Sequence, residues 1–228
     1  MAAAAAAAAA SAGKARPPLY YLAIDVETLG PRFSDSVIAL GAVFGPADGS
    51  WPRDRLCRFR GDLRPMAGDT ADAHCLHDFW DKNREVLAEI RAAAESPYVV
   101  LRQFLGFCRG LVTEFEDTGK GEIALVTDCA DTDIGRLHYL AEVKTRAWPT
   151  PLRALGTPGA WHHHTDPDER LASLGRHDAC AKWIRANVPG VVYDHRPDHD
   201  AEYGYYQMVY LSKCAQAAAA AAADTMTC

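Results

Sequence analysis

The segment "YLAIDVETLG" (21–30) ends a run of apolar and β-branched residues with two carboxylates one residue apart. Such a run predicts a β-strand, here over residues 19–26. Side chains alternate across a strand, so Asp25 and Glu27 are expected on the same side of it. Carboxylates held this close repel one another and take up protons unless a divalent cation neutralises them. Taken alone, the pair is equally explained by Asp25 capping a turn and Glu27 lying in solvent.

Two further strands are predicted at 36–45 and 55–63, where short apolar runs lie between Gly, Pro and Asp residues. The brief turn at 31–35 makes the first two strands a hairpin, and the third completes an antiparallel meander. Arginines at 53, 55, 58, 60 and 64 either follow a phosphate backbone or protect a solvated edge strand from pairing with other sheets.

Beyond the meander the hydrophobic period becomes helical. Segments of helical character are predicted at 71–83, 84–95, 98–117, 132–144, 168–188 and 200–213. The segment 98–117 precedes a strand predicted at 121–128, and a strand that follows a crossover helix enters the sheet parallel. The predicted fold class is therefore α/β, a mixed sheet with an antiparallel three-stranded meander followed by parallel strands, flanked by helices.

Length and composition indicate one globular domain, because 228 residues that are 49% hydrophobic bury a single core. We expect a disordered Ala-rich leader at 1–17, one domain at 18–214, and an Ala-rich tail at 215–228 that extends the last helix. The net charge of −6 excludes coating of a nucleic-acid duplex by bulk charge, so such a partner must be held locally.

The spacing of the cysteines and the hydropathy of the chain indicate the kind of cellular compartment to expect. The seven cysteines form no CxxC pair and are odd in number, which is typical of reduced thiols and buried core positions. No run is apolar enough for long enough to span a membrane. The sequence therefore predicts a soluble, intracellular protein.

Two more acidic groups follow the first. Asp128, Asp131 and Asp133 lie where strand 121–128 gives way to a helix, and they either bind a metal or favour a helix N-terminus, with Asp131 suited to the N-cap. Acids at the carboxyl ends of strands lie where sites assemble in α/β sheets. Carboxylate oxygens select Mg²⁺ or Mn²⁺ over Zn²⁺.

The third group is "HRPDHDA", in which His195 precedes Asp200 by five positions. A histidine beside a metal-binding aspartate suits a general base, because its pKa lies near neutrality. A surface turn with Asp198 or Asp200 as a helix cap is the alternative. Three acidic groups in this order are much less expected by chance than any one of them.

Taken together, these segments resemble the DEDDh 3′–5′ exonucleases of the ribonuclease H-like superfamily over about residues 20–213. The family motif D-x-E-T-x-G is matched by "DVETLG", and H-x-x-x-x-D by "HRPDHDA". The motif N-x-x-x-D is matched at Asp133 by "CADTD", with Cys129 where asparagine is usual. The residues around the first motif, and "DFW" at 78–80, are similar to the phage and viral branch related to exonuclease A and exonuclease eight.

This resemblance implies two Mg²⁺ or Mn²⁺ ions and a substrate of single-stranded DNA or RNA 3′ ends, with nucleoside 5′-monophosphates as products. Asp25, Glu27 and Asp200 would hold one ion, and Asp25 with Asp133 the second. His195 would be the general base. Thr28 and Leu29 would contact the terminal nucleotide. Asp128 is the alternative to Asp133 in the second motif.

Two other functions remain open at this point: a catalytically silent nucleic-acid-binding homologue, and an endonuclease or resolvase on the same core. The intact set of acids and His195 argues against the first, and the second would not require the H-x-x-x-x-D pattern. The adjacent histidines at 162–164 are interpreted as loop decoration, because consecutive side chains do not converge on one ion. His177-Asp178 is a weaker rival for the third motif, and Trp80 is expected to pack in the core.

Overall fold

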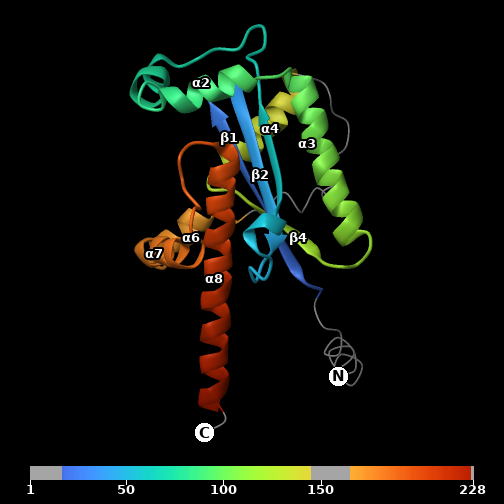
Figure 1. Ribbon diagram of the computed structural model, residues 1–228, viewed down its shortest axis with the longest axis vertical. Helices are drawn as coiled ribbons and strands as arrows, with labels where there is room; N and C mark the ends of the chain where they lie inside the picture. Colours follow the sequence, from blue (N-terminus) through green and yellow to red (C-terminus); the bar gives the residue numbers. More distant parts are fainter. Residues whose placement is uncertain (1–16, 145–164, 227–228) are drawn as a thin grey trace, which may run out of the picture.

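The computed structural model describes residues 17–144 and 165–226, which form a mixed sheet covered by helices on both faces (Figure 1). Its four strands lie in the order β3-β2-β1-β4. The strands are β1 (Leu19–Thr28), β2 (Val37–Pro46), β3 (Cys57–Asp62) and β4 (Glu122–Val126). β2 is antiparallel to β1 and β3, whereas β4 is parallel to β1. The predicted meander and mixed sheet are confirmed, and a single parallel bridge from Val126 to Thr165 extends the parallel side.

The described helices follow the predicted order along the chain. They are α2 (Arg84–Ala93), α3 (Pro97–Leu111), α4 (Ala130–His138), α6 (Pro167–Ser173), α7 (His177–Asn187) and α8 (Pro197–Met226). Short π-helical stretches lie at Cys75–Trp80, Val112–Glu116 and Tyr139–Lys144, and a 3₁₀ turn lies at Arg53–Arg55.

The segment 168–188, predicted as one helical stretch, forms two helices. Gly175 follows the end of α6 with a φ of 60°, a left-handed conformation that glycine adopts without the steric cost of a Cβ and that commonly ends a helix. His177 is consequently the first residue of α7 and not a residue of a helix interior.

Strand alternation sorts the core between the two faces of the sheet. Leu22 and Ile24 of β1 pack in the cluster that includes α3, whereas Tyr21 and Ala23 pack in the cluster that includes α8. Asp25 and Glu27 continue the odd-numbered series, which places them toward the α8 face. The face on which their carboxylates lie is thus set by the same alternation that builds the core.

The two ends of the chain are where the domain boundaries were predicted. Residues 215–226 continue α8, exposed over 215–223, and Figure 1 shows the helix running past the end of the sheet, in line with the expected extension of the last helix. Most of the Ala-rich leader, residues 1–16, lies outside the described residues, so the boundary at residue 17 stays a prediction. None of the helices in the described ranges has the length and hydropathy needed to cross a bilayer.

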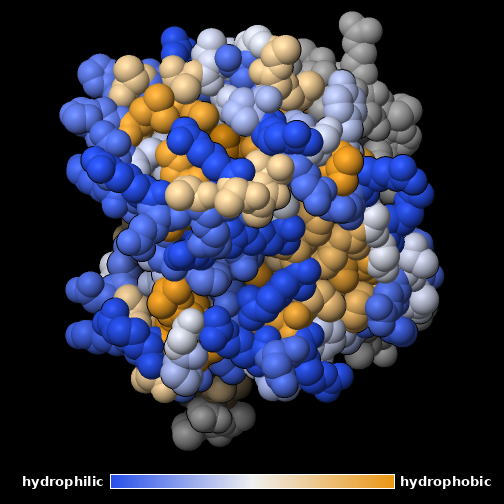
Figure 2. Space-filling view, turned by 45° about the horizontal axis from the view of Figure 1, so that its top comes forward, coloured by the Kyte–Doolittle hydropathy of each residue, from blue (hydrophilic) through white to orange (hydrophobic). Residues whose placement is uncertain are grey.

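The arginines near β3 are engaged within the protein. Arg53 and Arg58 both bind Glu202 of α8, whose side chain is only 1% exposed, at 2.7 and 2.6 Å. Arg60 binds Asp62 and Glu89. β3 is the edge strand, so these contacts favour the edge-strand interpretation for three of the five arginines. On the face shown in Figure 2 hydrophilic and apolar side chains are intermingled.

Gly41 of β2 lets α8 approach the sheet beside the acidic strand end. It pairs with Asp25 across the hairpin, and a Cβ at this position would lie 2.1 Å from the backbone of Pro197 and 2.3 Å from the amide nitrogen of Asp198. The first turn of α8 therefore lies directly on the backbone of β2. This contact brings Asp200 to β1.

We expect Gly41→Ala to destabilise the protein by about 1–3 kcal/mol, the usual cost of overpacking, because α8 must move away from the sheet. Gly106→Ala is the matched control. Gly106 lies in α3 with nothing within 4 Å of an added Cβ, so alanine there should stabilise by up to about 1 kcal/mol. Urea unfolding checks both variants. Equal stability of Gly41→Ala and wild type would show that α8 does not depend on this contact.

Candidate metal centre and active site

Acidic side chains from four segments meet at the carboxyl end of β1. Two groups with no residue in common each have ligand atoms that lie within 4.8 Å of one another. One group contains Glu27, His195 and Asp200, and the other contains Asp25, Asp128 and Asp133. All five residues that the sequence predicted as metal ligands or general base are present, together with Asp128.

Burial and mutual repulsion raise the pKa values of these carboxyls. Burial, followed by the charges of Glu27 and then Asp133, raises the pKa of Asp25 well above its usual range. The pKa of Glu27 is raised in the same way by burial and by Asp200. Burial raises the pKa of Asp133 to about 8 and that of Asp200 to about 7. When these carboxyls are ionised, the protein groups around them therefore do not compensate their negative charge.

The donor set fits a divalent cation. Oδ2 of Asp25 is buried and has no hydrogen-bond partner among the described residues, an arrangement that is costly unless another group satisfies the oxygen. Nearly all the ligand atoms offered are carboxylate oxygens, and these suit Mg²⁺ or Mn²⁺. Asp25, Asp128 and Asp133 would hold one ion, and Glu27 and Asp200, next to Asp25, would hold another.

Asp128 and Asp133 both lie against Asp25, so they are not mutually exclusive as the sequence suggested. Asp133 is 3% exposed and accepts a hydrogen bond from the Thr127 hydroxyl, which fixes its carboxylate. Asp128 is half-buried at the end of β4. The expected N-cap role of Asp131 is wrong, because α4 begins at Ala130 with Cys129 as its N-cap residue.

The loop before α8 holds His195 in an unusual backbone conformation. Its φ of 61° is the one left-handed value among the described non-glycine residues. Asp200 stabilises this conformation by accepting the amide protons of Asp194 at 2.9 Å and His195 at 3.2 Å. Nδ1 of His195 lies 3.8 Å from Oδ2 of Asp200, and burial lowers the pKa of His195. The imidazole is thus neutral near pH 7 and able to accept a proton. Asp200 lies inside the first turn of α8 and accepts amides from the preceding loop, so it is not the cap of this helix, and its role as a metal ligand stays a prediction.

Arg196 ties this loop to the rest of the fold. Its guanidinium binds Glu89 of α2 at 2.9 Å and Asp194 at 2.7 Å. On the other side, the ring of Phe79 contacts that of His195 edge-on, with centroids 4.6 Å apart. The position of the histidine is therefore fixed by groups from three segments of the chain.

The turn after Glu27 carries the two residues predicted to contact a nucleotide. The Thr28 hydroxyl and the Arg136 guanidinium both donate to the carbonyl of Gly30, at 3.0 and 2.7 Å. Leu29 is 6% exposed and packs in the cluster with Trp80, so its predicted contact with the terminal base stays a prediction. Trp80 is buried as expected, and its indole N–H donates to the Thr28 carbonyl at 2.9 Å.

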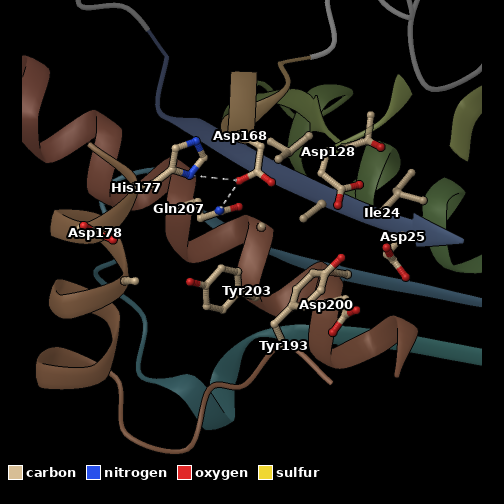
Figure 3. A pocket seen from close by; sticks show the side chains of 16 residues that line it. Ile24, Asp25, Asp128, Asp168, His177, Asp178, Tyr193, Asp200, Tyr203 and Gln207 are labelled. Carbon is tan, nitrogen blue, oxygen red and sulfur yellow. Dashed lines mark hydrogen bonds and ion pairs between the residues drawn. The ribbon is translucent and has the colours of Figure 1, made fainter. Parts of the chain in front are cut away.

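A pocket opens beside Asp25 and contains residues that sequence reasoning missed (Figure 3). Tyr193 lines it together with Asp128 and Asp200. Pro197, not an acid, lies four positions after Tyr193, so no acidic motif in the sequence marks a role for this tyrosine. His177-Asp178 lies in the wall of this pocket and in neither ligand group. Residues 162–164 lie outside the described ranges.

Several solved structures share the fold of this chain. Cell-death related nuclease 4 (CRN-4) matches with a TM-score of 0.52 and 14% identity over 87% of this chain, which spans 64% of CRN-4. S. pombe Pop2p, in a form with bound Mg²⁺ and Mn²⁺, matches with a TM-score of 0.54 and 12% identity over 84% of this chain and 82% of that one. The RNase domain of yeast Pop2 matches with a TM-score of 0.52 and 10% identity over 87% and 78%.

At these identities the likeness shows the fold. The chain has the ribonuclease H-like fold that its motifs predicted, and shares it with these nucleases. No protein-family model and no curated protein sequence matches the chain.

The raised pKa values predict how the metal-free protein responds to pH. Asp133 and Asp200 have folded-state pKa values of about 8 and about 7, above the unfolded value of about 4. The folded state therefore binds more protons than the unfolded state between these limits. The stability that these two protonated carboxyls contribute is fully present below about pH 4 and is lost as the pH rises through about 7 and 8.

Thermal unfolding in a chelator should accordingly give a lower Tm at pH 8.5 than at pH 5.5. Mn²⁺ should restore the loss at pH 8.5, because a ligand that binds only the folded state stabilises it. Asp133→Asn should flatten the pH dependence, whereas Asp117→Asn, an exposed site at the other end of β4, should not. A Tm in chelator that rises with pH would contradict the electrostatic description of the cluster.

Proposed function

We propose that the protein is a metal-dependent 3′–5′ exonuclease that hydrolyses single-stranded DNA or RNA from its 3′ end and releases nucleoside 5′-monophosphates. The observation that supports this proposal is the pair of ligand groups at the carboxyl end of β1, in which a buried carboxylate oxygen of Asp25 has no hydrogen-bond partner among the described residues. The shared fold with nucleases, one of them binding Mg²⁺ and Mn²⁺, supports a phosphodiester as substrate. The 3′–5′ direction rests on the resemblance of the three motifs.

The carboxylates bind and orient the reactants. When bound, two divalent cations supply electrostatic stabilisation of the attacking and leaving oxygens of an in-line phosphoryl displacement. Asp25 belongs to the group with Asp128 and Asp133, and the charges of Glu27 and Asp200 from the other group also raise its pKa, so it links the two groups electrostatically. Asp133 and Asp200 are held by the Thr127 hydroxyl and by the amides of residues 194 and 195, so their oxygens are already oriented before substrate arrives.

His195 takes the proton of the attacking water. Its imidazole is neutral near pH 7, lies in the same ligand group as Glu27 and Asp200, and is oriented by the loop that Arg196 anchors. A base placed and poised in this way contributes about 10²–10⁴-fold to a rate. Thr28, half-buried on the adjoining turn, is the residue we assign to contact the 3′-terminal nucleotide.

The proposal is tested with a 5′-labelled single strand of DNA or RNA incubated with Mg²⁺, Mn²⁺ or a chelator. The expected result is a metal-dependent ladder that shortens from the 3′ end. Internal cuts alone would indicate an endonuclease, and binding without cleavage would indicate a silent homologue; either result contradicts the proposal.

Variants assign the roles of the residues. Asp25→Asn and Asp200→Asn should reduce cleavage to background, and His195→Gln should lower kcat by about 10²–10⁴-fold while Mn²⁺ still binds in calorimetry. Asp117→Asn is the matched control and should cleave as wild type does. Full activity of His195→Gln would show that another group accepts the proton.

A further inference from the structure

The pocket beside Asp25 extends well beyond the two ligand groups. It runs between α6, α7 and α8 and has a volume of about 330 Å³, within the range of about 300–1,000 Å³ that is usual for small-ligand sites. Small side chains create this space; they are Ala23, Ala181, Ala201 and Gly204. An added Cβ at Gly204 would meet nothing within 4 Å, so the pocket is open at the α8 wall.

Two tyrosines form the aromatic part of the pocket. The rings of Tyr193 and Tyr203 are 5.7 Å apart and meet edge-on, and Figure 3 shows them between the acidic end and the α7 end of the pocket. Tyr193 is 52% exposed, so part of its side chain is accessible to a ligand. Base–aromatic stacking is the common use of such a surface in proteins that bind single strands.

The far end of the pocket is polar and acidic. Oδ1 of Asp168 accepts a hydrogen bond from Nε2 of Gln207 at 2.6 Å and lies 3.9 Å from Nδ1 of His177 (Figure 3). Asp178 lines the same end. These carboxylates repel a phosphate and accept hydrogen bonds from amino groups.

We propose that this pocket holds one nucleobase of the strand whose phosphate lies at the acidic cluster, with Tyr193 as its stacking wall and Asp168 as the acceptor for its edge. The proposal rests on the proposed nuclease function for the placement of the phosphate. Asp25 and Asp200 line this pocket, so the pocket is continuous with the acidic cluster. A base whose sugar-phosphate is bound at the cluster therefore enters the pocket directly.

The acidic end predicts which bases are preferred. Guanine presents adjacent N–H and amino groups that a carboxylate accepts together, and cytosine and adenine each present one amino group. Uracil places carbonyl oxygens on both sides of its N–H, and a carboxylate repels these. The expected order of affinity is therefore guanine first and uracil last.

Calorimetry with Mn²⁺ measures this with nucleoside 5′-monophosphates and with ribose 5-phosphate, which has the same phosphate and sugar but no base. In the wild type, GMP should bind about 5- to 150-fold more tightly than ribose 5-phosphate, the range expected for stacking of one base. Gly204→Leu should abolish this difference by filling the pocket. Gly106→Leu, the same substitution at an open helical position on α3, should preserve it.

The edge of the base is tested separately. Asp168→Asn keeps an acceptor for Gln207 but removes the charge, and should bring the affinities for GMP and UMP together, whereas Asp117→Asn should not. Equal binding of GMP and ribose 5-phosphate to the wild type, or an unchanged difference in a folded Gly204→Leu variant, overturns the pocket assignment. A failure of the proposed nuclease function appears instead as absence of strand cleavage, which this binding measurement does not depend on.

Discussion

Mutual repulsion among buried carboxylates is the constraint around which this structure is arranged. Asp25, Asp133 and Asp200 are each less than a tenth exposed, and their pKa values are raised because burial and neighbouring charge disfavour ionisation. A fold that keeps such a cluster gives up stability above about pH 7 unless a cation compensates the charge. We interpret the cluster as a cation site whose cost in the metal-free state is offset on binding.

The surrounding fold keeps the acids together despite their repulsion. Gly41 allows α8 to touch the sheet, and Asp200 is further fixed by the loop amides that it accepts. Arg136 holds the turn after Glu27 from α4, the helix that also carries Asp133. Asp133 and Asp200 therefore reach the site on separately anchored helices, beside the strand that carries Asp25 and Glu27.

Much of the fold and of the acidic site was predictable from the sequence, because local patterns of residues encode both. Alternation in β1 placed Asp25 and Glu27 on one side, and the change of period predicted the crossover to a parallel β4. What could not be predicted depends on contacts between distant segments. The approach of residues 197–198 to Gly41 and the position of Tyr193 beside the acids leave no local signal. The break at Gly175 was visible as a glycine, but a helical pattern on both sides concealed it.

The number of Mn²⁺ ions bound to the wild type and to Asp25→Asn, measured by calorimetry near pH 7.5, tests the central claim most directly. Asp25 interacts electrostatically with acids of both ligand groups. We therefore expect two ions in the wild type and impaired binding of both in the variant, with a higher metal-free Tm because a repelling charge is removed. A wild type that binds no Mn²⁺, or an Asp25→Asn variant that binds two ions with unchanged affinity, would contradict this claim.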